Sequence, residues 1–321
     1  MSMNYRKGVE SAAALLHGHV RYTPCQLSPR LSQATGAQVY LKLENFQVTG
    51  SFKARGAAHK MLSLSEEARD AGVVAASSGN HGAGVAYASL TLGVNARIYV
   101  PEVADPAKIA AIESYGATVI VEGADCVDAE RIARAYGEAH GQTYISPYND
   151  LEVMLGQGTI GAEIEEQLGS VDAVFVSLGG GGLISGIGGY LKAGHSQTQA
   201  IACSPEQSPA MHECLLAGKI IDVPCFDTLS DATAGGVETG AITFETCMDV
   251  VDQSLLLSES EIQEATRLLI EDEHMLVEGA AGLALAGLLK TAESWRGKRV
   301  VVVLCGANIG REKLRRVLIP S

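Results

Sequence analysis

Basic clusters and long hydrophobic runs are both missing from this sequence. Its 24 Lys and Arg residues stand against 37 Asp and Glu, a net charge of −13, and they nowhere gather into a patch. No nucleic-acid partner is expected, because phosphate backbones are bound by clustered cations. No apolar run approaches a membrane-spanning length, and the apolar stretch 12–16 is too short for a signal peptide, so that no membrane partner is expected either.

Paired or metal-ligating cysteine spacings are also absent. The seven cysteines are scattered, odd in number and never form a C-x-x-C pair. They read as reduced thiols of a cytoplasmic protein, and no metal site is expected.

What the sequence does contain is an ordinary globular composition, with 47% hydrophobic and 19% charged residues. Short β-branched runs alternate with longer stretches of helical period, which predicts α/β architecture with parallel sheets covered by helices. The strand candidates are 39–43, 73–77, 97–100, 118–121, 173–178, 200–203 and 299–305, and the helical candidates include 51–62, 81–92, 106–115, 125–140, 158–167, 183–193, 259–273 and 279–290.

The strands between about Val73 and Tyr144 form a block that predicts a smaller lobe. We expect a small domain at 66–149, inserted into a discontinuous large domain at 1–65 and 150–321, with no regulatory domain appended. Ligands in such folds bind at the carboxyl ends of strands. A cleft between the two lobes is the expected site.

A glycine run directly follows one of these strands. Gly179, Gly180, Gly181 and Gly182 lie between the strand 173–178 and a helical pattern. Successive glycines can turn backbone N–H groups toward one point, and the following helix N-terminus also favours an anion. The run matches neither G-x-G-x-x-G nor the P-loop, and a phosphate held without metal fits it better than a flexible loop does.

Two other strand ends carry polar residues. Ser77-Ser78-Gly79-Asn80-His81-Gly82 precedes a helix, and its hydroxyls, amide and N–H groups suit a carboxylate, although for the stretch taken alone a helix cap is the favoured interpretation. The last strand ends in Cys305, which alone reads as a buried small hydrophobe. Glu278 precedes an Ala-rich helix and is compatible with a site role or with stabilising that helix N-terminus.

One lysine stands beside a strand end as well. Lys53 lies between Phe52 and small residues, just after the strand near 38–44. A partly desolvated lysine can be neutral and attack a carbonyl near neutral pH. The three turns and this lysine can converge on one cleft.

Together these motifs resemble the serine/threonine dehydratase family, pyridoxal-phosphate enzymes of fold type II related to serine racemase. The matching stretches are Ser51-Phe52-Lys53-Ala54-Arg55-Gly56, Ser77-Ser78-Gly79-Asn80-His81-Gly82, Gly179 to Leu183 and Cys305-Gly306-Ala307-Asn308. The resemblance covers nearly the whole chain in the right order. It implies two lobes, each with a mainly parallel sheet as in tryptophan synthase β, and a homodimer.

The resemblance also implies roles for single residues. Lys53 binds pyridoxal 5'-phosphate covalently and later moves the α-proton of the substrate. The cofactor phosphate is bound by Gly179, Gly180, Gly181, Gly182 and Leu183, while the cofactor ring is contacted by Phe52, Asn80, Glu278 and Cys305. The substrate carboxylate is held by Ser77, Ser78, Asn80 and His81.

The thiol at 305 bears on the type of reaction. The family places a hydroxyl or thiol beside the pyridine nitrogen, and a thiol is only a weak donor and acceptor. This favours loss of a β-leaving group over transamination. Ser78 matches the serine that acts on the opposite face in racemases, so weak racemisation is expected as a side reaction.

Two departures from the family pattern concern metal and substrate. Where many relatives have Glu-Pro with a cation-binding Glu, this chain reads Cys203-Ser204-Pro205-Glu206. Where relatives have Ala-Asp-Gly, it reads Ser230-Asp231-Ala232. The first puts metal dependence in question, and the second adds a methyl group near the expected ring.

Three functions compete on these observations. The first is an ammonia-lyase for a 3-hydroxy amino acid such as threonine or serine, or for a bulkier one such as phenylserine, 3-hydroxyaspartate or a hydroxyectoine-derived substrate. The second is a racemase or β-replacement synthase. The third is a cofactor-carrying binding protein, against which Lys53 and the complete 77–82 loop argue.

Overall fold

Two separate sheets form the framework of the computed structural model, which describes residues 5–195 and 197–319. The six-stranded sheet has the order β1-β2-β10-β7-β8-β9 and the four-stranded sheet the order β5-β4-β3-β6. The strands are β1 (Cys25–Leu27), β2 (Gln38–Lys42), β3 (Val73–Ala76), β4 (Ala96–Val100), β5 (Thr118–Val121), β6 (Thr143–Tyr144), β7 (Ala173–Ser177), β8 (Gln199–Pro205), β9 (Gln253–Leu257) and β10 (Arg299–Val303). Apart from the antiparallel pair β1 and β2, the described strand pairs are parallel.

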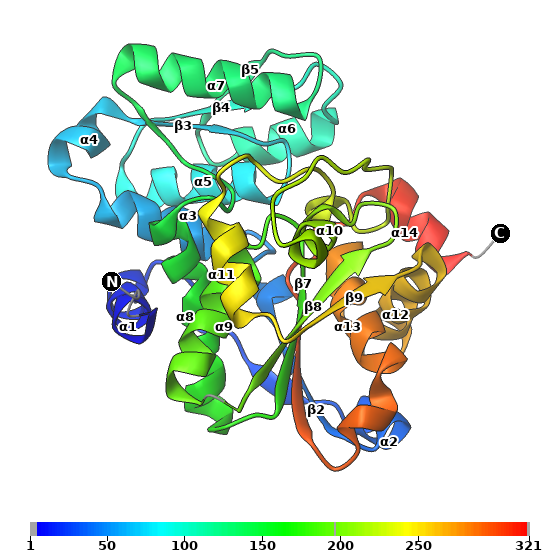
Figure 1. Ribbon diagram of the computed structural model, residues 1–321. Coiled ribbons are helices and arrows are strands. Elements are labelled where there is room, and N and C mark those ends of the chain that lie inside the picture. The colour runs from blue at the N-terminus through cyan, green and yellow to red at the C-terminus, as the bar shows by residue number, and fades with distance from the viewer. Residues whose placement is uncertain (1–4, 196, 320–321) are drawn as a thin grey trace.

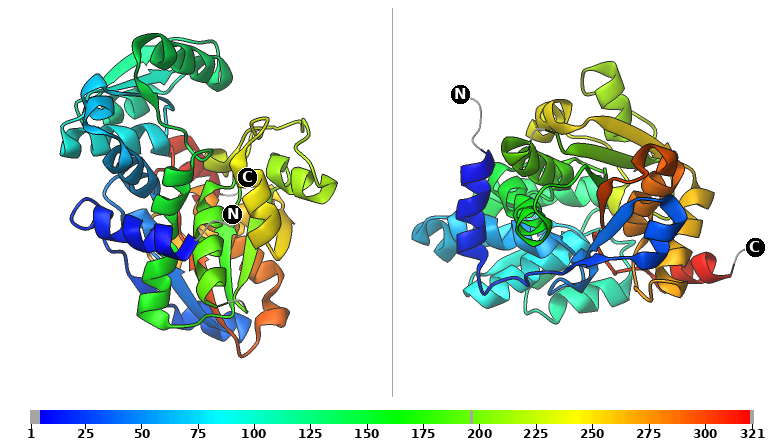
Figure 2. Two further views of the ribbon diagram at one scale, coloured as in Figure 1. Left: turned by 60° about the vertical axis from the view of Figure 1, so that its left-hand side comes forward. Right: turned by 90° about the horizontal axis from the view of Figure 1, so that it is seen from below.

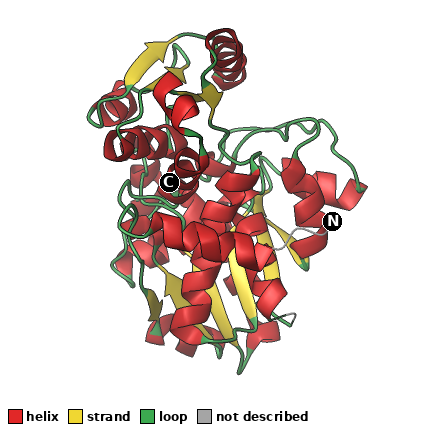
Figure 3. Cartoon of the chain, turned by 90° about the vertical axis from the view of Figure 1, so that its left-hand side faces the viewer, coloured by secondary structure: helices red, strands yellow, loops and turns green. Residues whose placement is uncertain are grey.

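Helices cover both sheets. They are α1 (Tyr5–Leu16), α2 (Pro29–Thr35), α3 (Lys53–Ser63), α4 (Glu66–Ala71), α5 (Asn80–Leu92), α6 (Pro106–Glu113), α7 (Cys126–His140), α8 (Leu151–Leu168), α9 (Gly182–Gly194), α10 (Ala210–Ala217), α11 (Ile242–Val250), α12 (Glu259–Glu271), α13 (Gly279–Lys290) and α14 (Arg311–Leu318), with short 3₁₀ turns η1 (Glu44–Phe46), η2 (Asp231–Thr233) and η3 (Ala292–Trp295). Figures 1 and 2 show α8 and α9 on one side of the six-stranded sheet and α12 and α13 on the other. The helices enclose both sheets, which are yellow in Figure 3.

The centre of the six-stranded sheet is apolar on both faces. Val300, Val301, Val302 and Val303 of β10 are fully buried, and β10 pairs in parallel with β2 and β7. A parallel strand covered on both faces has no polar side to present, which explains the unbroken valine run. This sheet therefore supplies the rigid floor beneath its strand ends.

The four-stranded sheet shows the expected alternation of faces. Val74 and Tyr99 cluster with Ala133 of α7 on one face, whereas Val73 and Ala75 belong to the cluster that includes residues of α5. Figure 1 shows α7 above this sheet and α5 and α6 below it, toward the larger sheet. The lower layer also contains residues of α3, so that α3 and α5 lie between the sheets.

The predicted fold class is confirmed, with differences at individual elements. Each predicted strand is present within a few residues. Helix α8 begins at Leu151 rather than at Gly158, because Asp150 caps it through the N–H groups of Glu152 and Val153. The short strands β1 and β6 and the five-residue strand β9 were not predicted.

The domain boundaries stay a proposal. Two sheets, one of which consists of β3 to β6, support a small domain at 66–149 within a large domain at 1–65 and 150–321. None of the helices in the described part of the chain combines the length and hydrophobicity needed to cross a membrane.

Candidate functional site

The loop before α3 is joined to the end of β10. The N–H of Phe52 donates to the carbonyl of Cys305 at 3.1 Å, and that of Ala307 donates to the carbonyl of Gly50 at 2.8 Å. Gly50 has φ 72°, a conformation that glycine adopts without strain. Distant parts of the sequence thus bring Lys53 and Cys305 to one place.

Lys53 is the first residue of α3, and its ammonium group is partly buried. Its Nζ donates to the carbonyl of Pro147 at 2.7 Å and lies 5.1 Å from the centre of the Phe52 ring. Burial lowers the pKa of Lys53 to about 8, against the opposing electrostatic effects of Cys305 and Glu278. At pH 7 about a tenth of such amines are neutral, which is the form that proton abstraction and covalent attachment need.

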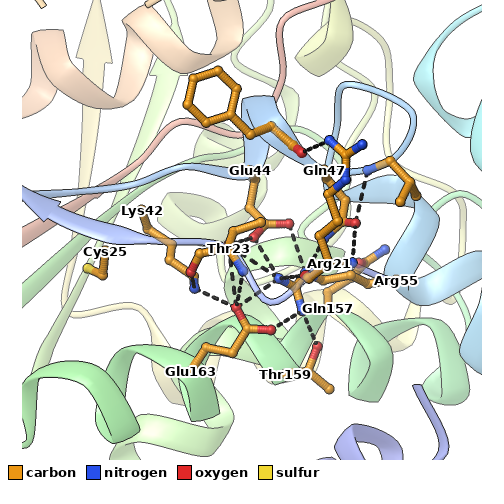
Figure 4. A network of polar contacts seen from close by, with 12 residues as sticks. Arg21, Thr23, Cys25, Lys42, Glu44, Gln47, Arg55, Gln157, Thr159 and Glu163 are labelled. Carbon is orange, nitrogen blue, oxygen red and sulfur yellow. Dashed lines mark hydrogen bonds and ion pairs between the residues drawn. The ribbon is translucent and has the colours of Figure 1, made fainter. Parts of the chain in front are cut away.

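A buried ion network holds the helix that carries Lys53. Arg55 binds both oxygens of Glu44 at 2.8 Å and both oxygens of Glu163 at 2.6 and 2.9 Å. Lys42 adds a second cation, which donates to Glu163 (Figure 4). Because Glu44 follows β2 and Glu163 lies in α8, this network ties α3 to two neighbouring elements. We call Lys42, Glu44, Arg55 and Glu163 the Arg55 cluster.

The glycine run forms a cradle that only glycine can line. A Cβ on Gly180 would strike the ring of Tyr148, and one on Gly179 would come within 2.9 Å of Thr233. Gly181 has φ 88°, and it precedes α9, whose first N–H groups lack intrahelical acceptors. The backbone N–H groups of this run and of the first turn of α9 are not covered by side chains. They fit the phosphate group that the resemblance implies.

Changing Gly180 to alanine should weaken cofactor binding. The added methyl group would displace Tyr148 or the loop, and overpacking of this kind costs about 1–3 kcal/mol, or roughly tenfold to a hundredfold in the dissociation constant. Equilibrium titration of cofactor-free protein with pyridoxal phosphate measures this dissociation constant. Gly310→Ala is the matched control, because a Cβ there meets nothing within 4 Å; equal affinities in the two variants would contradict the cradle.

The loop after β3 offers donors at the start of α5. Gly79 precedes the helix and its N–H donates to Ser77 Oγ at 3.1 Å, while Ala83 N–H already binds the Gly79 carbonyl. The N–H groups of residues 80–82 have no intrahelical acceptor. Among the described residues, the partly exposed hydroxyl of Ser78 has no hydrogen-bond partner in the protein. These groups can receive a carboxylate.

His81 contributes to this loop differently from the side chains beside it. Its ring is buried and Nε2 lies 2.8 Å from the carbonyl of Ile145. Burial, and then the charge of Lys53, lower the pKa of His81 to about 3, so that the ring is neutral. A substrate contact from His81 would come from its backbone N–H.

Asn80, Glu278 and Cys305 lie close together. Asn80 Nδ2 lies 2.9 Å from each Glu278 oxygen, and Cys305 Sγ lies 3.9 Å from Glu278 Oε1. Ser177, at the end of β7, donates to Cys305 Sγ at 3.5 Å. The structure thus brings together side chains from strand ends of both sheets.

The two departures from the family pattern lie at defined places. Cys203 is buried and Ser204 Oγ donates to the Leu178 carbonyl. The thiol and the hydroxyl stand where many relatives have the cation-binding carboxylate. Asp231 is half-exposed and lies within 3.7 Å of Lys108 and Lys313. Within the described residues, no cluster of three or more His, Cys, Asp and Glu residues could hold a metal ion.

Three site residues were not identified from the sequence. Tyr148 lies against the glycine cradle, the Pro147 carbonyl accepts from Lys53, and Asn308 donates to Asn80 at 2.7 Å. Tyr148 and Pro147 follow β6, a strand too short to be recognised. Asn308 belongs to the matched stretch that begins at Cys305, but no role was assigned to it from the sequence. Its position just after β10 was the one signal that could have indicated a role.

The chain matches the family model described as pyridoxal-phosphate dependent enzyme over residues 16–306. It is 39% identical over 310 residues to the L-threonine ammonia-lyase of Thermotoga maritima, covering 97% of this chain and 77% of that protein. It is 37% identical to an L-threo-3-hydroxyaspartate ammonia-lyase of a Pseudomonas species, covering 99% of both.

Among solved structures, maize serine racemase superimposes with a TM-score of 0.91 at 29% identity, covering 97% of this chain and 95% of that one. These similarities agree with the two-sheet fold, with the glycine cradle and with Lys53, which begins α3 beside the end of β10. The chain therefore belongs to the serine/threonine dehydratase family of pyridoxal-phosphate dependent enzymes with fold type II.

Proposed function

We propose that this protein is an ammonia-lyase that converts a 3-hydroxy amino acid, with threonine or serine as first candidates, into a 2-oxo acid and ammonia. The observation that carries the proposal is Lys53, a partly buried amine with a lowered pKa beside Cys305 and Glu278. The name of the Thermotoga relative supports the substrate class.

The chain's own residues supply binding and proton transfer. Bound pyridoxal phosphate supplies the electron sink that makes the α-proton of an amino acid removable. The N–H groups of the glycine cradle hold the phosphate, Phe52 lies beside Lys53, and the 77–82 loop holds the substrate carboxylate. Lys53 Nζ, released from its covalent role, accepts the α-proton.

Loss of the β-hydroxyl as water completes the reaction. In the net balance, the α-proton taken up by Lys53 and the departing hydroxyl amount to one water molecule released. Hydrolysis of the resulting enamine consumes one water molecule, so that no oxidant is required. A carboxylate beside the ring nitrogen would keep that nitrogen protonated. Cys305 would place a thiol there instead, and because a thiol is only a weak donor and acceptor, elimination is favoured over transamination.

L-threo-3-hydroxyaspartate is the second candidate substrate. The Pseudomonas relative named for it matches this chain over 99% of both lengths. Lys108, whose charge opposes the upward shift of the Glu278 pKa, pairs with Asp231 at 3.7 Å and can serve a second substrate carboxylate. A racemase is the third candidate, supported by the likeness to maize serine racemase and by the unpartnered Ser78 hydroxyl.

A panel of 3-hydroxy amino acids tests the proposal. Purified holoenzyme is incubated with serine, threonine, phenylserine, 3-hydroxyaspartate and hydroxyectoine-derived substrates, and 2-oxo acid, ammonia and the opposite enantiomer are assayed. We expect stoichiometric 2-oxo acid and ammonia from at least one member, with Lys108→Met reducing kcat/KM selectively for 3-hydroxyaspartate if that is the substrate. Folded holoenzyme that releases no 2-oxo acid from any member contradicts the proposal.

A homodimeric state, a cytoplasmic location and the absence of a nucleic-acid partner belong to the same proposal. The family resemblance supports the dimer, the scattered cysteines support the location, and the net charge of −13 argues against nucleic acid. Light scattering of the purified protein measures its oligomeric state.

A further inference from the structure

Glu278 immediately precedes α13 but does not cap it. Its backbone is extended, its side chain makes no capping hydrogen bond to its own helix, and only 2% of its surface is exposed. The carboxylate instead lies against Gly306, where a Cβ would come within 2.7 Å of Oε1. Stabilising the helix N-terminus therefore does not explain where this side chain points.

The carboxylate fixes the orientation of the Asn80 amide. Asn80 Nδ2 faces both Glu278 oxygens at 2.9 Å, while Asn308 Nδ2 donates to Asn80 Oδ1 at 2.7 Å and to the Thr49 carbonyl at 2.9 Å. Turning the amide over would place Asn80 Oδ1 against the carboxylate and its Nδ2 against the Asn308 donor. Both ends of the Asn80 side chain are thus held.

The same carboxylate reaches the Cys305 thiol. Sγ is 3.9 Å from Glu278 Oε1 and receives the Ser177 hydroxyl at 3.5 Å. An ionised carboxylate can only accept, so the thiol proton points toward it; a protonated carboxyl carries its own donor. When Glu278 is protonated, its carboxyl O–H can donate to Cys305 Sγ, and the thiol proton is free to point elsewhere.

Titratable groups from several elements face Glu278. Lys53 comes from α3, Cys305 from the end of β10, Asp231 from η2 and Lys108 from α6. Burial raises the pKa of Glu278 to about 7; Asp231 adds to this effect, while hydrogen bonds from Asn80 and the Asn308 backbone and the charge of Lys108 oppose it. The carboxyl is therefore protonated below about pH 7 and ionised above it.

We propose that Glu278 is a positioning residue that clamps Asn80 and, by gaining or losing one proton, reverses the direction of the hydrogen bond with the Cys305 thiol. The inference rests on the proposed function for the assignment of Asn80 and Cys305 to the two ends of the cofactor ring. A thiol proton directed at Glu278 leaves sulfur lone pairs for the ring, whereas a reversed thiol offers the ring a proton. One buried carboxyl thereby changes the polarity beside the ring while the Asn80 contact stays in place.

The S–H stretching band of Cys305 tests this directly. Infrared spectra of wild-type holoenzyme minus those of the Cys305→Ser holoenzyme isolate the band from the other six thiols. We expect it to move to lower frequency as pH rises through a midpoint of about 7, since a hydrogen bond to a charged acceptor is the stronger one. Glu278→Gln holoenzyme should show no pH-dependent displacement, because glutamine does not titrate.

Two further variants distinguish the outcomes. Asp231→Asn removes a charge that raises the pKa of Glu278, so the midpoint of the band displacement should fall. Because Asp231 lies at the surface, this variant also tests the inference if Glu278→Gln does not fold. Glu165→Gln, which alters a carboxylate bound to Arg6 and Tyr190, should leave the midpoint unchanged. A pH-independent band in wild-type protein, or an unchanged displacement in Glu278→Gln, contradicts the inference.

Turnover tests the proposed function, whereas the pH dependence of the Cys305 S–H band tests the role of Glu278. An enzyme that turns over amino acids with a pH-independent band refutes the Glu278 inference alone. A protein that shows the displacement but turns over no member of the panel refutes the proposed function alone.

Discussion

Replacing Lys53 with alanine is expected to abolish turnover and the visible absorbance of the covalently bound cofactor while leaving the fold intact. The change removes both the amine that attaches the cofactor and the base that accepts the α-proton. A positioned proton-transfer group alone contributes up to about 10⁴-fold, so that kcat should fall by at least roughly that factor. Absorbance spectra and 2-oxo acid release measure the two effects, and far-ultraviolet circular dichroism monitors the fold.

Lys60→Ala is the matched control for this experiment. Lys60 lies in the same helix, but its Nζ pairs with Asp150 at 2.6 Å rather than with a site group. This variant should keep the cofactor absorbance and turnover. Retained activity in Lys53→Ala, or equal losses in both variants, would refute the assignment of Lys53.

The positions of the main strands could be predicted because their patterns are extreme. The run 300–303 is pure valine and the run 173–177 is almost wholly apolar, as strands buried on both faces require. Glycines or polar residues directly after such strands indicate a site at the carboxyl edge. The strand pattern alone therefore predicts that Gly179 to Gly182 and Cys305 lie at the same edge of one sheet.

The remaining parts of the site depend on contacts that no periodicity encodes. The strand β6 has two residues, so the Pro147 carbonyl and Tyr148 could not be placed relative to Lys53 and Gly180. Helix α13 also gave no indication that Glu278 turns away from its own N-terminus. Hydrogen bonds between residues far apart in sequence decided that orientation.

The position of Lys53 depends on buried groups that do not contact it. The Arg55 cluster joins α3 to α8, and α8 follows directly on Pro147 and Tyr148. A Cβ on Gly156 would come within 2.8 Å of the Arg55 carbonyl, so that the two helix backbones are in close contact. The short distance from Lys53 Nζ to the Pro147 carbonyl therefore reflects how α3 and α8 are fastened together.

Changing Arg55 to methionine is expected to lower the free energy of unfolding by about 3–5 kcal/mol, the usual cost of leaving a buried charge without its partner. The change leaves Glu44 and Glu163 with Lys42 as the remaining cation of the cluster. Adding Glu44→Gln removes the excess negative charge and should recover part of the loss, since the double variant is balanced again, with the cation Lys42 and the anion Glu163. Urea-induced unfolding of the three proteins measures both effects.

An exposed ion pair supplies the matched control for the Arg55 cluster. Arg296 and Glu293 form a 2.7 Å pair with side chains 64% and 83% exposed, and Arg296→Met should cost less than about 1 kcal/mol. If Arg55→Met is no more destabilising than Arg296→Met, the cluster does not fasten α3. If Glu44→Gln adds to the loss instead of offsetting it, hydrogen bonds rather than charge balance hold the lysine helix in place.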